Sequence, residues 1–142
     1  ELPFAPHTKE QFEKESKDPN EFKARRARFM LETYAERREP RKLAYPVQDV
    51  RFDERFACVT LGGEVVIDYA LWVQRTFPGE RLMVAGYSND VPCYIPSARV
   101  LKEGGYEAVD SMIYYGQPGP FTEEVEPRIQ EAVQQVMARV KK

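Results

Sequence analysis

The side chains with the clearest chemical potential lie in two short segments. Gly62-Gly63-Glu64 ends an apolar run, and GYSNDVPCYIPS, residues 86 to 97, carries a second group of polar side chains that includes Tyr94. A carboxylate such as Glu64 and a phenol such as Tyr94 both offer oxygen ligands to a cation. The alternative is structural: a helix dipole would stabilise Glu64 at the start of a helix, and Tyr94 would be a buried ring with a hydrogen-bonded hydroxyl. The residues by themselves leave both interpretations open.

The two glycines before Glu64 do not predict a phosphate site. A helix N-terminus attracts anions, but Glu64 already places a negative charge there, and the longer glycine spacing of phosphate-binding loops is missing. In the second segment, Asn89 and Asp90 suit a turn, because their side chains hydrogen-bond the local backbone, and Pro92 makes this turn rigid.

A strand-helix-strand unit is expected to position these groups. FACVTL, residues 56 to 61, predicts a short strand, and apolar residues at helical spacing predict a helix that begins at Glu64 and ends before Pro78-Gly79. RLMVAGY, residues 81 to 87, is apolar without alternation after Arg81, as is typical of a buried parallel strand covered on both faces. A crossover helix makes the two strands parallel, so their carboxyl ends meet at one edge, where ligands bind in open α/β sheets. This reasoning predicts a functional loop at that edge, formed by Gly63, Glu64, Asn89, Asp90 and Tyr94.

The flanking segments predict two helices before this unit and one after it. Thr8 to Gln11 has the pattern of a capping box, and Asp18-Pro19 begins a second helix over residues 22–38, which Pro40 ends. The expected apolar side of that helix consists of Phe22, Phe29, Met30 and Tyr34. The expected apolar stripe of the final helix consists of Val125, Ile129, Val133, Val136 and Val140.

Shorter elements complete the expected fold. Residues 43–52, interrupted by Pro46, suit either an edge strand or a mixture of loop and strand. A short helix begins near Ser97 and ends at Gly104-Gly105, and residues 106–116 suggest a further strand. We therefore expect a layered α/β fold with a parallel β-α-β unit, preceded by two N-terminal helices and closed by a C-terminal amphipathic helix. Residues 1–142 form one domain in this interpretation, with a helical arm over 8–38 and an α/β part over 42–142.

Charge excludes one class of partner and leaves another open. With 21 Lys and Arg against 23 Asp and Glu, the chain is no polycation, so we expect no nucleic-acid partner. Residues 23–42 nevertheless hold eight basic and three acidic side chains. The basic helix 22–38 is therefore either a solvated face or a docking element for a membrane surface or a protein partner. The sequence has no apolar run long enough to span a bilayer, and its first residues, ELPFAPHTKE, do not have the pattern of a signal peptide.

Cysteine and histidine usage exclude several metal and nucleophile sites. Cys58 and Cys93 form no CxxC motif, so they are either two buried free thiols or one disulfide. His7 is the only histidine and lies in a proline-rich leader, where we expect a solvated side chain. A Ser-His-Asp triad or a multi-histidine metal site cannot be built from this chain alone.

Four motifs in order resemble the C-terminal part of the catalytic domain of the neutral/alkaline, non-lysosomal ceramidases and their bacterial relatives. They are Gly62-Gly63-Glu64, the loop GYSNDVPCY that ends at Tyr94, GYEA at residues 105–108, and YYGQPGPFT at residues 114–122. In that family, the glutamate of a Gly-Glu at a strand end and the last tyrosine of a G-[YL]-x-N-x-x-x-x-Y loop are zinc ligands. The resemblance thus implies that Glu64 and Tyr94 are zinc ligands.

The chain departs from the family pattern in two respects. Gly62 stands where the family has proline, and VVIDYALW replaces a threonine-rich stretch that lies near the substrate in the family. The family's two zinc-binding histidines and its active-site serine lie upstream of the matched part, so no catalytic residue is assigned here. The resemblance implies the C-terminal portion of a secreted or periplasmic zinc amidohydrolase, whose zinc-activated water hydrolyses the N-acyl amide bond of a ceramide-like lipid. The two remaining zinc ligands would come from the upstream part of the same polypeptide.

Overall fold

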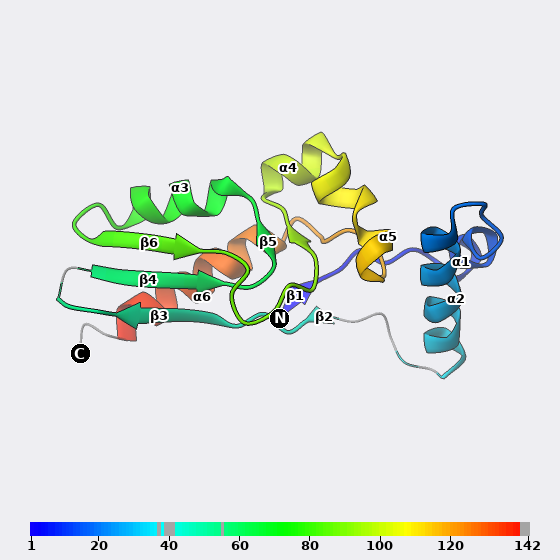
Figure 1. Ribbon diagram of the computed structural model, residues 1–142, viewed down its shortest axis with the longest axis horizontal. Helices are drawn as coiled ribbons and strands as arrows, with labels where there is room; N and C mark the ends of the chain where they lie inside the picture. Colours follow the sequence, from blue (N-terminus) through cyan, green and yellow to red (C-terminus); the bar gives the residue numbers. More distant parts are fainter. Residues whose placement is uncertain (37, 39–41, 55, 140–142) are drawn as a thin grey trace.

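The computed structural model describes residues 1–36, 38, 42–54 and 56–139, and it has the expected α/β architecture (Figure 1). In chain order the elements are β1 (Leu2–Pro3), α1 (Lys9–Glu15), α2 (Glu21–Ala35), β2 (Lys42–Leu43), β3 (Val47–Arg51), β4 (Phe56–Leu61), β5 (Glu64–Val65), α3 (Ile67–Thr76), β6 (Arg81–Ala85), β7 (Tyr94–Ile95), α4 (Ala98–Glu103), η1 (Tyr106–Asp110, a π-helical turn), α5 (Met112–Tyr115) and α6 (Val125–Arg139). None of the described helices combines the length and apolar character that crossing a membrane requires.

The main sheet has the strand order β3-β4-β6 and confirms the predicted β-α-β unit. β4 and β6 are parallel and in register from Phe56 opposite Arg81, and α3 connects them. β3 pairs with β4 in the antiparallel direction, so within the expected segment 43–52 the edge strand is confirmed for β3, whereas β2 pairs with β1 in a separate sheet. Both Cys58 and Cys93 are free and buried, which excludes the disulfide alternative.

One face of this sheet carries the core, and the other does not. Val59 and Leu61 of β4 share a buried cluster with α3 and α6, in which Tyr69 and Ile129 are almost fully buried. On the opposite face, the side chains of Val50, Cys58 and Met83 lie next to one another on β3, β4 and β6. Met83, at one end of this row of side chains, is 49% exposed. The expectation that β6 is covered on both faces is therefore wrong, because both helices pack on the same side of the sheet.

A second, two-stranded sheet holds Glu64 and Tyr94, the two residues with the clearest chemical potential. Glu64 and Val65 of β5 pair in parallel with Tyr94 and Ile95 of β7. The helix expected to begin at Glu64 begins instead at Ile67, because the N–H groups of Glu64 and Val66 donate to the carbonyls of Cys93 and Ile95. The interpretation of Glu64 as a carboxylate stabilised by a helix dipole is therefore wrong.

The N-terminal arm packs as a helix pair at one end of the molecule (Figure 1). The capping box of α1 is confirmed, whereas α2 begins at the N-cap Asn20 and not at Asp18. Met30 is buried as expected, but Phe22 and Phe29 are 48% and 45% exposed, so the expected apolar side is only partly correct. The helix ends at Ala35 with Glu36 as its C-cap, so the expected end at Arg38 is wrong, whereas Pro40 lies outside the described residues.

The C-terminal half contains one wrong prediction and two confirmed ones. Residues 106–116 form η1 and α5 in place of a strand, because Gly105 and Gly116 adopt positive φ angles that bound short helical turns. The predicted short helix is α4, which Ser97 caps. The final helix is α6, and its stripe is buried at Val125, Ile129 and Val133 and partly buried at Val136, whereas Val140 lies outside the described residues.

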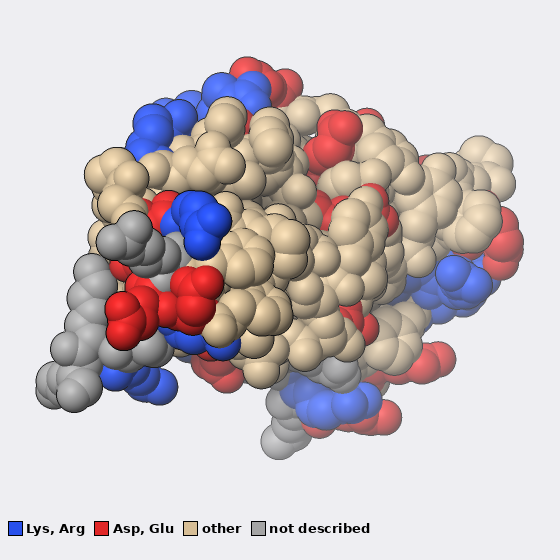
Figure 2. All heavy atoms as spheres, turned by 60° about the vertical axis from the view of Figure 1, so that its left-hand side comes forward, with Lys and Arg blue, Asp and Glu red and all other residues tan. Residues whose placement is uncertain are grey.

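Charged side chains of both signs are mixed over the surface. Figure 2 shows them mainly around the margin of the visible face, with uncharged residues over much of its middle. This arrangement agrees with the net charge of −2 and gives no polycationic face on this side of the molecule.

Candidate functional site

The Glu64 carboxylate lies among three tyrosine hydroxyls. Tyr87 donates to Oε2 of Glu64 at 3.0 Å, and Tyr115 donates to Oε1. Tyr94 is the direct register partner of Glu64, and its hydroxyl also interacts with the carboxylate. The structure thus brings together Glu64 and Tyr94, the two proposed metal ligands, at the carboxyl end of the parallel unit.

Hydrogen bonding in this cluster keeps the carboxylate ionised and the phenols protonated. The pKa of Glu64 is lowered, chiefly by the hydrogen bond from Tyr115 and then by that from Tyr94. The same interaction with Glu64 raises the pKa of Tyr94 to about 12, and it also raises the pKa values of Tyr87 and Tyr115. A charged oxygen donor surrounded by neutral hydroxyl groups suits a cation, because the carboxylate carries its charge before the cation arrives.

A surface pocket of about 430 Å³ opens beside this cluster. Its polar walls come from Glu64 and two of the tyrosines, together with acidic residues of α4 and η1. Its apolar wall comes from the start of α3 and from α4. The lining residues are Glu64, Val65, Val66, Ile67, Tyr87, Tyr94, Arg99, Val100, Glu103, Gly104 and Glu107. The pocket therefore combines oxygen donors with apolar surface, as small-molecule sites commonly do.

The other members of the predicted edge loop hold the backbone of the site. The N–H of Gly63 donates to the carbonyl of Asp90 at 2.8 Å, and the Asp90 carboxylate accepts from the N–H of Val91. Asn89 adopts a left-handed φ of 67°, and its amide donates to Gln48 at 3.1 Å. Asn89 and Asp90 thus act as turn formers, with hydrogen bonds to Gln48 and Val91 and not to the Glu64 carboxylate.

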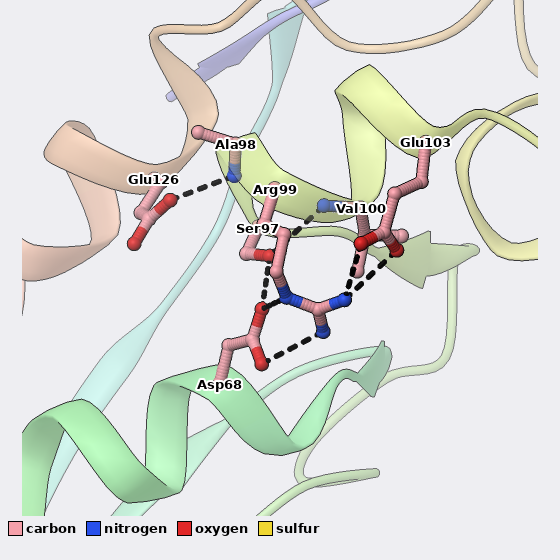
Figure 3. A network of polar contacts seen from close by, with 7 residues as sticks. All are labelled: Asp68, Ser97, Ala98, Arg99, Val100, Glu103 and Glu126. Atoms are coloured by element: carbon pink, nitrogen blue, oxygen red, sulfur yellow. Dashed lines mark hydrogen bonds and ion pairs between the residues drawn. The ribbon is translucent and has the colours of Figure 1, made fainter.

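A polar network fixes α4, which forms one wall of the pocket, against α3 (Figure 3). Ser97, which is almost fully buried, donates its hydroxyl to Asp68. Arg99 donates to Asp68 at 3.0 Å and to both oxygens of Glu103 at 2.8 Å. From α6, Glu126 accepts the N–H of Ala98 at 2.7 Å. Three helices are therefore connected through residues that begin α4.

Tyr87 and Tyr115 were not identified from the sequence as members of the site. Each lies inside a motif quoted for the family resemblance, but neither has a spacing that separates it from an ordinary core tyrosine. Tyr106 also joins the cluster, because its ring centroid lies 5.7 Å from that of Tyr94. The sequence offers one signal for the cluster, which is the local concentration of tyrosines: five of the eight fall between residues 87 and 115.

The described residues include no complete set of metal-binding side chains. Among them, no group of three or more His, Cys, Asp and Glu side chains gathers around one point. His7 belongs to another cluster: its Nδ1 lies 3.2 Å from Glu15 and 3.3 Å from Arg26. The expectation of a solvated His7 is therefore wrong.

Comparison of the chain with family models, curated proteins and solved structures finds no match.

Proposed function

We propose that the chain is the C-terminal part of a zinc-dependent amidohydrolase that resembles the neutral ceramidases and cleaves the N-acyl bond of a ceramide-like lipid. One observation supports this proposal above the others. The resemblance selects Glu64 and Tyr94 by motif alone, and these two residues are register partners on the wall of a pocket of about 430 Å³. Two ligands of one cation have to lie close together, and this pairing meets that requirement.

The donor chemistry at Glu64 fits zinc. Zinc binds nitrogen and oxygen ligands, and a catalytic site typically has about three protein ligands and one position for water. Glu64 offers an ionised carboxylate, and Tyr94 offers a phenol whose proton a nearby divalent cation would displace. Two histidines from the upstream part of the polypeptide would bring the protein ligands to four, one more than the usual three, so the water would be a fifth ligand. Bound zinc would lower the pKa of its water to about 7 and so supply a hydroxide for attack on an amide carbonyl.

The residues of this chain would also bind and orient the substrate. Val66, Ile67 and Val100 give the pocket an apolar wall beside the oxygen donors, where an acyl chain can exclude water. The network around Asp68 and Arg99 keeps α4, and with it this wall, in place.

Zinc analysis of the whole protein beside the 142-residue chain tests this proposal. We expect about one zinc ion per whole protein, and we expect Glu64→Ala and Tyr94→Phe to reduce zinc content and amidase activity together. The matched control is Glu107→Ala, because Glu107 lines the same pocket and has no role as a ligand in the proposal. Full retention of zinc and activity in both ligand variants would refute it.

A second candidate function is docking to an anionic membrane through α2. The observation that favours it is the pair of exposed rings on this helix, Phe22 and Phe29, with the Arg25 guanidinium 5.6 Å from the centre of the Phe22 ring. Arg26 takes no part, because it is buried and paired with Glu15. The test is flotation with anionic vesicles. Binding that survives the combined change of Arg25 and Arg28 to alanine would count against this function.

A further inference from the structure

The two oxygens of the Glu64 carboxylate have different partners. Oε1 accepts from Tyr115, a partly buried side chain on α5. Oε2 accepts from Tyr87, which is 63% exposed. One oxygen therefore faces the interior of the molecule, and the other faces the pocket that Tyr87 lines.

Three neighbours of Tyr115 in the sequence hold α5, the helix that carries it, in place. Met112, one turn earlier in α5, is fully buried in the main core. Tyr114 packs edge-on against Phe22 of the arm, with ring centroids 4.9 Å apart. Gln117, just after α5, donates to the carbonyl of Pro92 at 2.9 Å, and Pro92 belongs to the loop that leads to Tyr94. Figure 1 shows α5 in the corresponding place, between the arm and the β5–β7 pair.

Tyr87 has much less support. Its backbone φ is 55°, an unusual value for a residue other than glycine, and its side chain lies at the surface. Its hydroxyl contact to Glu64 is between exposed groups, which contributes little in water. Rotation of Tyr87 away from Oε2 therefore requires no rearrangement of the core, whereas movement of Tyr115 does.

We propose that Tyr115 is the positioning residue of the site: its hydroxyl holds Oε1 of Glu64, so that Oε2 is presented to a cation in the pocket. Tyr87 only occupies Oε2 until a cation replaces it, and cation binding does not require Tyr87. This inference rests on the proposed function, and it adds a role that the ligand pair Glu64 and Tyr94 does not contain. A ligating carboxylate generally needs such a hydrogen-bonded partner, because the partner fixes the rotamer in which the ligand meets the metal.

The first test examines the contact itself in the 142-residue chain, without metal. A tyrosine hydroxyl bonded to a carboxylate in a partly buried site exchanges slowly with water, so its proton should be visible by NMR. We expect one such signal to disappear in Tyr115→Phe and in Glu64→Ala, which removes the acceptor, and to remain in Tyr87→Phe. Absence of the signal from the unaltered chain, or its survival in Tyr115→Phe, would overturn the inference whatever the metal content of the whole protein.

The second test measures the dissociation constant for zinc in the whole protein by competition with a chelator. Loss of a residue that orients a metal ligand typically weakens metal binding about 10- to 100-fold. We expect this loss in Tyr115→Phe and less than about a threefold change in Tyr87→Phe. Tyr114→Phe is the matched control, because Tyr114 neighbours Tyr115 on α5 and makes ring contacts with Phe22 and Tyr106. Circular dichroism on each variant checks that it is folded.

The outcomes separate this inference from the proposed function. If Tyr94→Phe loses zinc while Tyr115→Phe binds it as tightly as the unaltered protein, the zinc site stands and the role of Tyr115 is refuted. If the whole protein binds no zinc, the proposed function fails, and the NMR signal alone decides whether Tyr115 fixes Glu64. Should Tyr115→Phe not fold, Gln117→Leu releases α5 from Pro92 and is expected to weaken zinc binding more than Tyr114→Phe does. Equal binding in these two variants would count against the inference.

Discussion

Glu64 faces Tyr94 across the β5–β7 pair, and the Glu64 N–H donates to the carbonyl of Cys93 at 3.0 Å. Backbone hydrogen bonds therefore fix the separation of these two residues. The side chains can take part in binding without also having to hold the strands together. The site depends in consequence on the turn that delivers the chain from β4 to β5.

We expect Gly63→Ala to destabilise the protein by about 1–3 kcal/mol. Gly63 has a φ of +74°, and a Cβ atom there would lie 2.7 Å from the carbonyl oxygen of Cys93. Gly79→Ala is the control, since nothing lies within 4 Å of the added carbon, and a change within about 0.5 kcal/mol is expected there. Urea unfolding measures both variants. Equal stability of the two would contradict the role of Gly63.

Truncation of the α6 stripe should produce a larger loss. Ile129 is 1% exposed and belongs to the main core. We expect Ile129→Ala to lower the free energy of unfolding by about 2–5 kcal/mol, because it leaves a cavity among packed neighbours. On the exposed side of the same helix, Gln134→Ala should change stability by no more than about 0.5 kcal/mol. A small effect at Ile129 would mean that α6 is not packed on the sheet.

Within the network of Figure 3, the neutral Ser97 should contribute more to the stability of the protein than the charged Arg99. Ser97 is 1% exposed, donates to Asp68 and caps the N–H of Val100 at 3.3 Å. Ser97→Ala is expected to cost about 1–2 kcal/mol. The Arg99 side chain is 58% exposed, so Arg99→Ala should cost less than about 1 kcal/mol. Thermal unfolding compares the two, and the reverse order would show that the exposed ion pairs are the main connection.

Stability should fall as the solution becomes mildly acidic because of His7. Burial, and then the charge of Arg26, lower the pKa of His7 below its ordinary value of 6.5, although Glu15 acts in the opposite direction. The unfolded chain then takes up the proton more readily, so the free energy of unfolding decreases as the pH falls through about 6.5 towards the lower pKa of the folded state.

Urea unfolding at pH 7.5 and at mildly acidic pH measures this slope. His7→Asn removes the titrating group, so we expect it to flatten the dependence within this window. An unchanged slope in the variant would show that other groups control it.

The sequence contained enough information for the central unit and for the meeting of Glu64 with Tyr94. Two short apolar runs, a helical spacing between them and the Pro78-Gly79 break predicted parallel strands, and the geometry of a crossover then brought the two segments to one edge. The start of α3 was misplaced because Val65 and Val66 suit a strand as well as a helix. A two-residue strand such as β5 exists only through its pairing with β7, which local preferences do not encode.

The convergence of the tyrosines was also beyond sequence reasoning. Tyr115 reaches Glu64 only because residues 106–116 form η1 and α5. This segment is rich in side chains that favour strands. It is nevertheless helical, and it is bounded by Gly105 and Gly116, which both have positive φ angles. The sequence also did not predict how far Phe22 is exposed to solvent, because its ring packs against Tyr114, which is distant along the chain. The zinc chemistry remains a prediction that rests on the family resemblance.

The bare face of the main sheet gives the molecule a built-in chemical reporter. Of the four methionines, Met30, Met112 and Met137 are buried, and Met83 is half exposed on that face. Peroxide converts accessible thioethers to sulfoxides, whereas packed ones react slowly. The rate of sulfoxide formation at Met83 therefore reads out the solvation of the sheet. Any partner or domain that lies over β6 would reveal itself by protecting this one sulfur atom from oxidation.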